Sequence, residues 1–332
     1  MPFYLNNTKY LSLYKLYNYL KSKTYFIFKK NGFNFLPYPL PYSLAIEPVN
    51  FCNLKCPECP TGTDKLTREK GYMDFELFKK NIDEQKSNLI CLILHFQGEP
   101  LLHENICDFI SYANKNNIYT MFSTNAQLLD SQFDDICKSG LDKLIISLDG
   151  LNQETYGKYR QNADISQVYK ALSKIKNYKK TQRPQIELQF LVFKHNEHEV
   201  KELKTVKSKY NIDKIAIKTA QIYNSPELVP ENENYSRYKK ENGRLTIKSE
   251  LKNSCRRMFS SAVITWDGYV VPCCFDKNAE FTMGNIKENS FREVWKSKKY
   301  SEFRKKIFTD RKSIKICRNC TENLKQKSIR YI

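Results

Sequence analysis

The sequence predicts an α/β protein with mostly parallel strands, followed by a small cysteine-rich module. Short apolar strands alternate six times with amphipathic helical stretches between Ser43 and Lys218, as expected for a sheet that helices cover. A separate group of cysteines then follows in residues 251–332.

The predicted elements follow one another in a regular βα order. Six units make either an open sheet or a barrel, and they are two short of a full eight-stranded barrel. Asp74 is the expected N-cap of the first helix and Gly140 the expected C-terminal stop of the third. The expected strands are Ser43–Glu47, Ile90–Phe96, Ile118–Ser123, Lys143–Ser147, Ile186–Val192 and Lys214–Lys218. The expected helices are Asp74–Lys86, Glu104–Asn116, Ser131–Lys138, Ile165–Lys179 and Asn196–Tyr210.

Composition narrows the class of protein. The chain has 332 residues, 41% of them apolar and 27% charged, which excludes a disordered chain and suits one large domain plus a small one. No apolar run approaches the roughly 18 residues of a membrane helix, and lysines interrupt every candidate signal peptide. We therefore expect no transmembrane segment and a cytoplasmic location. In that reducing compartment the closely spaced cysteines among the 11 are expected to bind metal rather than to form disulfides, whereas Cys91, Cys107 and Cys137 are expected to be ordinary buried thiols.

The charge balance is strongly basic. Lys and Arg number 55 and Asp and Glu 36, a formal net charge of +19. This favours an anionic partner such as nucleic acid, a phosphorylated substrate or lipid headgroups, or reflects a composition rich in Lys, Asn, Ile and Tyr. Because no RNA-binding motif is present, nucleic acid is not the expected partner. An RNA-modifying or RNA-binding protein remains an alternative function.

Residues 1–42 form a basic aromatic extension with six lysines and no acidic residue. Its apolar residues, such as Leu11, Tyr14, Tyr17 and Leu20, recur at helical spacing. We expect this stripe to pack on its own domain. A weak contact with a membrane surface is the alternative.

The strongest motif is C-x3-C-x2-C, formed by Cys52, Cys56 and Cys59 directly after the first strand. Parallel α/β proteins place their chemistry at this end of their strands. A tetrahedral zinc ion would need a fourth ligand, and none lies nearby in sequence. Three thiolates can instead hold an iron–sulfur cluster with one iron open to a small chelating ligand. A zinc-stabilised interaction protein, its site completed by a distant residue, remains the alternative.

This loop resembles that of the radical S-adenosylmethionine (SAM) superfamily. The resemblance covers residues 43–222 and implies a partial (β/α)6 TIM-type barrel. It implies a [4Fe-4S] cluster that binds SAM and cleaves it reductively to a 5′-deoxyadenosyl radical, which abstracts a hydrogen atom from the substrate. It also implies a reducing electron donor such as flavodoxin or ferredoxin.

Gln97, Gly98, Glu99 and Pro100 follow the second strand and resemble the family's G-G-E-P. The resemblance implies contact with the SAM amino group, for which a carboxylate is a fitting acceptor. Gln97 replaces the first glycine of the motif.

Two further motifs resemble those of the family. Ser123 and Asn125 belong to a segment like S-T-N-G, although Ala126 replaces its glycine and leaves the backbone turn in doubt. Ser147 and Asp149 match S-x-D-G, which implies contacts with ribose hydroxyls, and Ser147 is our choice for them.

Arg160 matches an arginine that reaches the SAM carboxylate, a role that suits its forked guanidinium. Glu58 stands where the family usually has an aromatic residue near adenine, so the adenine contact must come from elsewhere.

The last cysteines form a second group. Two separated pairs indicate a four-ligand zinc or iron–sulfur site. The spacing around Gly268 resembles the SPASM/twitch auxiliary-cluster domain, and that of 2-deoxy-scyllo-inosamine dehydrogenase in particular. This implies one auxiliary [4Fe-4S] cluster, and Cys274 competes with Cys273 as a ligand. The expected ligands are Cys255, Cys273, Cys317 and Cys320.

We therefore expect an auxiliary-cluster domain over 251–332 after a linker at 223–250. Trp266, Asp267 and Gly268 are expected to turn a hairpin. The expected reaction is oxidation of an alcohol or sugar-like metabolite, with maturation of a ribosomal peptide (RiPP) as the alternative. Four further residues at strand ends are candidates to line the substrate: His95, Gln189, Phe193 and Lys218.

Overall fold

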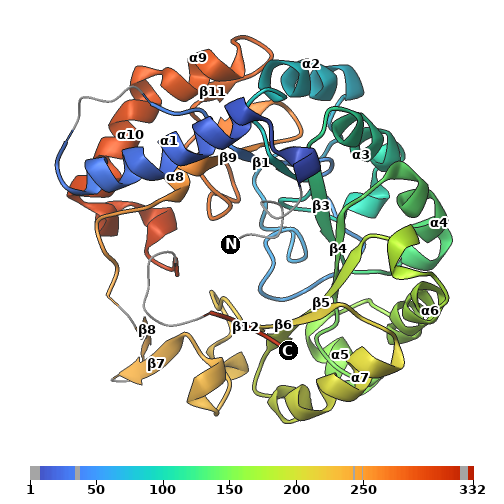
Figure 1. Ribbon diagram of the computed structural model, residues 1–332. Helices are drawn as coiled ribbons and strands as arrows, with labels where there is room; N and C mark the ends of the chain where they lie inside the picture. The colour runs from blue at the N-terminus through green and yellow to red at the C-terminus, as the bar shows by residue number, and fades with distance from the viewer. Residues whose placement is uncertain (1–7, 34–37, 242–243, 249, 322–327) are drawn as a thin grey trace. The chain divides into compact units, whose positions relative to one another are not determined.

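The computed structural model describes residues 8–33, 38–241, 244–248, 250–321 and 328–332 (Figure 1). Residues 1–7 and 34–37 of the basic extension lie outside the described residues. The chain divides into two compact units, called unit 1 and unit 2 below. Unit 1 consists of Met1–Asn50, Thr67–Met121 and Lys252–Asn323, and unit 2 of Phe51–Leu66, Phe122–Leu251 and Leu324–Ile332.

Unit 1 contains strands in the order β11-β10-β9-β1-β2, followed by the first half of β3 through Met121, and the second half of β3 belongs to unit 2. Parallel pairs join β9 to β1, β1 to β2 and β2 to β3, whereas β9, β10 and β11 are antiparallel. Gly268, at φ +91°, makes the predicted hairpin turn between β9 and β10, since a left-handed backbone costs glycine little. The bounds are β1 (Ser43–Ile46), β2 (Cys91–Ile93), β3 (Tyr119–Thr124), β9 (Ser261–Ile264), β10 (Tyr269–Val271) and β11 (Gly284–Asn285).

Four of the α-helices described in unit 1, namely α1, α2, α9 and α10, begin at side-chain caps. Asp74 caps α2 as predicted, because its Oδ1 accepts a hydrogen bond from the Leu77 amide at 2.8 Å. Ser290 and Glu293 form a reciprocal capping box at α9. The α-helices are α1 (Leu13–Lys30), α2 (Phe75–Gln85), α3 (Ile106–Lys115), α8 (Arg257–Ser260), α9 (Phe291–Lys296) and α10 (Lys298–Thr309). Short 3-10 turns are η2 (Thr8–Tyr10), η3 (Pro100–Leu102), η8 (Arg311–Ser313) and η9 (Lys315–Cys317).

Unit 2 contains strands in the order β4-β5-β6-β12. The first three are parallel, and β12 runs antiparallel to β6. The strands are β4 (Lys143–Ser147), β5 (Gln185–Val192), β6 (Lys214–Thr219) and β12 (Ile329–Tyr331), with a separate hairpin of β7 (Tyr238–Glu241) and β8 (Arg244–Ile247). The helices are α4 (Leu129–Ser139), α5 (Gln153–Tyr159), α6 (Ile165–Lys176) and α7 (Leu203–Lys209), with turns η4 (Lys180–Gln182), η5 (Glu197–Glu202), η6 (Pro226–Leu228) and η7 (Glu233–Tyr235).

All six predicted strands are present, and the predicted α/β class is confirmed. The second strand was predicted over Ile90–Phe96, and in the structure β2 spans only Cys91–Ile93. Gly140 ends α4 in the left-handed conformation, at φ +79°, as predicted. Helix α5 was not predicted, and residues 223–250, expected to be a linker, contain the antiparallel pair β7 and β8.

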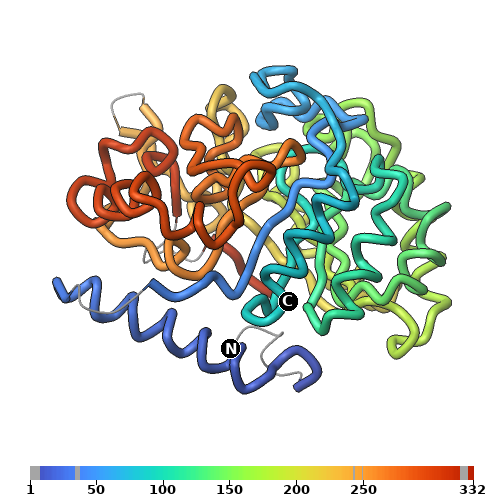
Figure 2. The backbone as a smooth tube through the Cα atoms, turned by 90° about the horizontal axis from the view of Figure 1, so that it is seen from above, coloured from blue at the N-terminus to red at the C-terminus, as the bar shows by residue number. Residues whose placement is uncertain are grey.

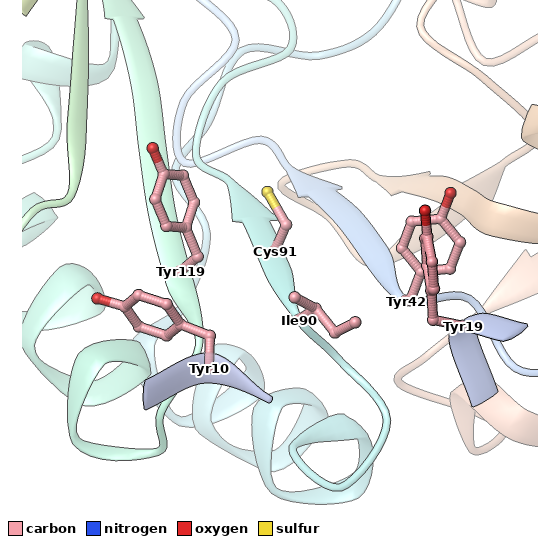
Figure 3. Packing of buried hydrophobic residues seen from close by; sticks show 6 residues of the cluster. All are labelled: Tyr10, Tyr19, Tyr42, Ile90, Cys91 and Tyr119. Atoms are coloured by element: carbon pink, nitrogen blue, oxygen red, sulfur yellow. The ribbon is translucent and has the colours of Figure 1, made fainter. Parts of the chain in front are cut away.

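The N-terminal segment closes the start of the strands in unit 1. Tyr10 from η2 packs edge-to-face on Tyr119 at the start of β3, with 5.5 Å between the ring centroids, and Tyr19 from α1 packs on Tyr42, just before β1, at 4.9 Å. These rings and the buried Ile90 form one apolar cluster (Figure 3). Burial of aromatic side chains here fixes the N-terminal segment to the barrel strands.

Helix α1 packs in a way that contradicts the prediction for its apolar stripe. The side chains that face the protein are polar or tyrosine: Lys15, Asn18, Tyr19, Ser22 and Tyr25. Predicted stripe residues Tyr14, Tyr17 and Leu20 are instead at least half exposed. The reason is a set of specific polar bonds: Asn18 with Leu40, Ser22 with the Phe259 carbonyl, and Lys15 with the Asn117 carbonyl.

A buried ion pair joins three segments of unit 1. Glu47, directly after β1, is fully buried and accepts two hydrogen bonds from the Arg68 guanidinium, at 2.6 and 2.7 Å. Its oxygens also accept the backbone amides of Gln97 and Trp266, at 3.3 and 3.2 Å. Burial raises the pKa of the Glu47 carboxyl, and Arg68 opposes this shift. One carboxylate thus fixes the ends of β1 and β2 against the β9–β10 turn.

Replacement of Glu47 by Gln is expected to lower the free energy of unfolding by about 3–5 kcal/mol, because Arg68 would be left as an uncompensated buried charge. The measurement is the urea midpoint of the anaerobic holoprotein. The double variant Glu47→Gln/Arg68→Met should recover most of the loss. Asp135→Asn, which breaks the exposed Asp135–Lys138 pair, should leave the midpoint nearly unchanged. Equal losses in all three variants would contradict this assignment.

Candidate active site

The predicted cysteine loop folds back on itself within unit 2. The Cys59 amide donates to the Cys56 carbonyl at 3.1 Å, and the Thr63 amide donates to the Cys59 carbonyl at 3.0 Å. Gly62 lies so close to Cys56 that a Cβ on Gly62 would meet the Cys56 nitrogen at 2.6 Å. Only glycine permits this approach, so the sequence after the third cysteine shapes the loop.

Each of the first two thiols faces a nitrogen donor. The Cys52 sulfur receives the Leu54 amide at 3.4 Å and the Asn125 side-chain amide at 3.6 Å. The buried Cys56 sulfur lies 3.9 Å from Nη1 of Arg160. Burial raises the pKa of the Cys56 thiol, and the Arg160 cation opposes that shift. Such donors stabilise sulfur ligands that carry negative charge.

Arg160 is held in place by Asp149. Nε and Nη2 of Arg160 lie 2.6 Å from Oδ2 of Asp149. The other carboxylate oxygen of Asp149 accepts the Leu191 amide at 2.7 Å. Asp149 is fully buried, and burial raises its pKa, whereas Arg160 lowers it. Both oxygens of Asp149 therefore have protein partners, while Nη1 of Arg160 faces the cysteine loop.

The other predicted residues of unit 2 lie at the ends of β3 and β4. Asn125 bridges from the end of β3 to the cysteine loop, since its amide also donates to Asn53 at 2.8 Å. Ser123 lies within β3, and Ser147 is the buried last residue of β4. Ala126 adopts φ +63°, so the turn that we doubted is present even without glycine.

Glu58 connects the cysteine loop to the segment after β6. Its carboxylate is buried and accepts three backbone amides: Tyr223 at 2.7 Å, Ser225 at 2.7 Å and Asn224 at 3.2 Å. Glu58 thus holds the cysteine loop to the segment after β6 through these hydrogen bonds.

Gln97, Gly98, Glu99 and Pro100 belong to unit 1. Gly98 adopts φ +78°, and Oε1 of Glu99 caps η3 by accepting the Leu101 amide at 3.2 Å. The Gln97 side chain donates to the neighbouring Phe96 carbonyl at 3.0 Å.

The auxiliary cysteines gather in unit 1 around a cation that the sequence did not single out. Arg311 is fully buried, and its Nη2 lies 3.4 Å from the Cys320 sulfur. The same guanidinium hydrogen-bonds to Cys317 and interacts with Cys255. It is anchored by the Ser254 carbonyl at 2.7 Å. No motif marks Arg311, because its position depends only on the folded path of residues 252–320.

Cys273 and Cys274 differ in their surroundings. Burial holds the pKa of the Cys273 thiol well above the ordinary value, and the neighbouring Cys274 and the more distant Cys255 and Cys320 add to this shift. Cys274 is exposed and lies 3.5 Å from Nη1 of Arg257. The inward position of Cys273 fits a ligand of the auxiliary site.

The donor sets fit iron–sulfur clusters. Three thiols on one loop, and a second group of three buried thiols with the partly buried Cys273, match the cysteine ligation of [4Fe-4S] clusters, in which each cysteine binds a different iron. Within the described ranges, no three His, Cys, Asp or Glu side chains are placed to hold a single metal ion.

Of the four candidate substrate-lining residues, two contact each other. Nζ of Lys218 donates to Oε1 of Gln189 at 2.6 Å. Phe193 is fully buried against Tyr159, at 4.2 Å between centroids, as a core residue. His95 belongs to unit 1, beyond the end of β2.

Comparison with known proteins identifies two families. Residues 46–205 match the radical SAM superfamily, and residues 255–321 match SPASM, an iron–sulfur cluster-binding domain.

Individual relatives align over most of the chain. The tungsten-containing aldehyde ferredoxin oxidoreductase cofactor-modifying protein of Pyrococcus furiosus is 27% identical over 79% of this chain and 82% of its own. The SAM-dependent 2-deoxy-scyllo-inosamine dehydrogenase of Niallia circulans is 24% identical over 87% and 96%, respectively. Among solved structures, Streptococcus suis SuiB bound to SAM has a TM-score of 0.65 at 16% identity, covering 92% of this chain and 77% of that one.

These matches confirm the resemblance and the predicted partial barrel with its auxiliary domain. The chain belongs to the radical SAM superfamily: it is an enzyme with a C-terminal SPASM domain, and its cofactors are a [4Fe-4S] cluster, SAM and an auxiliary iron–sulfur cluster.

Proposed function

We propose that this enzyme oxidises an alcohol or sugar-like metabolite to a carbonyl compound. The observation that supports the proposal is the auxiliary group of four thiols, Cys255, Cys273, Cys317 and Cys320, beside the Arg311 cation. Four cysteines are enough to ligate every iron of one cluster, and such a cluster is suited to accept an electron rather than to bind substrate. The dehydrogenase of Niallia circulans is named for an oxidation of this type.

The reaction is balanced by two one-electron steps. When bound, the first cluster and SAM supply a 5′-deoxyadenosyl radical, with the starting electron coming from a donor such as flavodoxin or ferredoxin. The carbinol carbon loses a hydrogen atom, which forms 5′-deoxyadenosine. The resulting substrate radical loses its hydroxyl proton to solvent and one electron to the auxiliary site, leaving C=O.

We assign the SAM-binding roles as follows. Cys52, Cys56 and Cys59 hold the first cluster, and Nη1 of Arg160, which Asp149 leaves available, binds the SAM carboxylate. The family resemblance alone assigns Glu99 of unit 1 as the acceptor of a hydrogen bond from the SAM ammonium group. Ser147 is the group for ribose, Asn125 bonds to the cysteine loop, and Asp149 acts as a positioning residue for Arg160.

A peptide is the second candidate substrate. SuiB has been solved with its precursor peptide SuiA, and that structure covers 87% of this chain with a TM-score of 0.63. Both candidate reactions begin with the same cleavage of SAM, so only the identity of the product distinguishes them.

The function is tested with anaerobically reconstituted enzyme, SAM, dithionite and a panel of cyclic aminopolyols that includes 2-deoxy-scyllo-inosamine. We expect 5′-deoxyadenosine together with a product lighter by two hydrogen atoms, and deuterium transfer from a C–D carbinol to 5′-deoxyadenosine. Loss of two hydrogen atoms from a peptide substrate, with no oxidation of any polyol, would favour peptide maturation.

In the same assay, Cys52→Ala/Cys56→Ala/Cys59→Ala should abolish 5′-deoxyadenosine formation. Cys317→Ala/Cys320→Ala should lose about half of the iron and retain some SAM cleavage without forming the carbonyl product. Cys107→Ala, at a half-buried thiol in α3, is the matched control and should retain both. If the second variant is folded yet cleaves no SAM, the proposed division between the clusters is wrong.

Arg160→Lys is expected to weaken SAM binding roughly 10- to 100-fold, because a hydrogen bond from the Nη1 cation to a carboxylate contributes about 1.5–3 kcal/mol. Asp149→Asn should change affinity in the same direction by releasing Arg160. Iron content should stay at the wild-type value in both variants. Equilibrium SAM binding and iron analysis check this, and unchanged affinity in Arg160→Lys would remove Arg160 from the site.

Arg311→Met is expected to lower the midpoint potential of the auxiliary cluster by roughly 60 mV or more, one tenfold change in a one-electron equilibrium. A nearby cation and hydrogen bonds to sulfur favour the reduced, more negative cluster. Redox titration followed by electron paramagnetic resonance measures this. Arg257→Met, beside the exposed Cys274, is the control and should shift the potential less. The reverse order would indicate that Cys274 is the ligand.

A further inference from the structure

Exposed apolar side chains are concentrated on one helix. Twelve large apolar residues are exposed among the described residues, and eight of them fall within Leu13–Phe33. Leu13 is 89% exposed, Tyr17 60% and Ile27 57%. The full set is Leu13, Tyr14, Leu16, Tyr17, Leu20, Ile27, Phe28 and Phe33. Exposed apolar side chains that gather on one segment mark an interaction site more often than scattered exposed residues do.

These residues lie on one side of α1. Positions 13, 16, 17, 20, 27 and 28 recur at intervals of three, four and seven residues, which places them on one helical face, with the exposed Thr24 between Leu20 and Ile27. The opposite face is fixed to unit 1 by the buried Asn18 and Ser22, whose side chains bond to the Leu40 and Phe259 carbonyls at 2.9 and 2.7 Å. Helix α1 therefore cannot turn its apolar face inward without breaking buried hydrogen bonds. Figure 2 shows α1 in dark blue at the margin of unit 1.

The charge on this segment has one sign. Residues 1–42 contain six lysines and no Asp or Glu. Lys21, Lys23 and Lys29 are partly exposed, and Lys30 is exposed. Lysine stems extend along apolar surface while the ammonium group stays in a polar phase. The segment thus combines an apolar face with cationic edges.

We propose that the exposed face of α1 docks the enzyme on an anionic membrane surface. A helix with Leu, Ile, Phe and Tyr on one face and lysines beside them binds in the plane of the lipid interface, with its apolar side chains about 5–10 Å deep and its cations at the headgroups. The apolar face runs from Leu13 to Phe28, nearly the whole helix, as a planar lipid surface requires. No helix in the described ranges is long and apolar enough to cross a bilayer, so the contact is peripheral.

The experiment is co-sedimentation of the full-length holoenzyme with vesicles. Vesicles of equal parts phosphatidylglycerol and phosphatidylcholine should bind the protein, pure phosphatidylcholine should bind it much less, and binding should weaken as salt rises. The variant Leu13→Gln/Leu16→Gln/Leu20→Gln should lower partitioning by more than about 100-fold, because three exposed apolar side chains would lose their burial in lipid. Glutamine keeps a good helix former at each position.

Lys21→Gln/Lys23→Gln/Lys30→Gln should lower partitioning to the anionic vesicles by roughly 100-fold, at about 1 kcal/mol for each lysine. Tyr331→Gln, which removes an aromatic side chain of similar exposure outside α1, is the control and should bind like the wild type. SAM cleavage and circular dichroism should be unchanged in every variant.

Three results would overturn the proposal. One is absence of binding to anionic vesicles, and another is equal binding of the leucine variant. The third is a concentration-dependent dimer in light scattering that the leucine variant abolishes, in a protein that does not bind vesicles. That result would assign the face to a second copy of the chain.

Discussion

The buried carboxylate of Glu47 is the constraint on which the arrangement of unit 1 depends. It follows the first strand, accepts both arms of Arg68, and accepts backbone amides from the segment after β2 and from the β9–β10 turn. A charge removed from water must have all of its partners in place. The three segments that contact Glu47 are therefore expected to become ordered together. The indole of Trp266 adds to the same junction by donating to the Glu69 carbonyl, and Gly71 is required there because a Cβ would meet the Trp266 ring at 2.4 Å.

Arginines have a second use in this chain, as cations placed beside thiols. Arg160 faces Cys56 in unit 2, and Arg311 faces Cys320 and Cys317 in unit 1. Each guanidinium is anchored by other groups: Arg160 by Asp149, and Arg311 by backbone carbonyls. Fixed cations near sulfur ligands influence both the pKa of the thiols and the potential of a bound cluster. Both cysteine sites thus contain an anchored arginine cation beside their thiols.

The N-terminal helix shows how polar bonds can override an apolar pattern. Hydrophobic periodicity alone predicts that the apolar face of α1 points inward. The side chains that point inward are instead Lys15, Asn18 and Ser22. They donate hydrogen bonds to the backbone carbonyls of Asn117, Leu40 and Phe259, respectively. These acceptors come from segments about 20 to 240 residues away, so no local pattern could reveal them.

The sequence by itself determined the elements and the cofactor chemistry, because both depend on local spacing. The alternation of apolar strands and amphipathic helices predicted six parallel strands that the structure contains, and C-x3-C-x2-C predicted the cluster loop. Only the tertiary structure decided which side chains complete each site. Asp149 positions Arg160, Glu58 accepts hydrogen bonds from the segment after β6, and Arg311 lies beside the Cys320 sulfur. These contacts join residues far apart in the chain, and their energies depend on burial, which spacing does not encode.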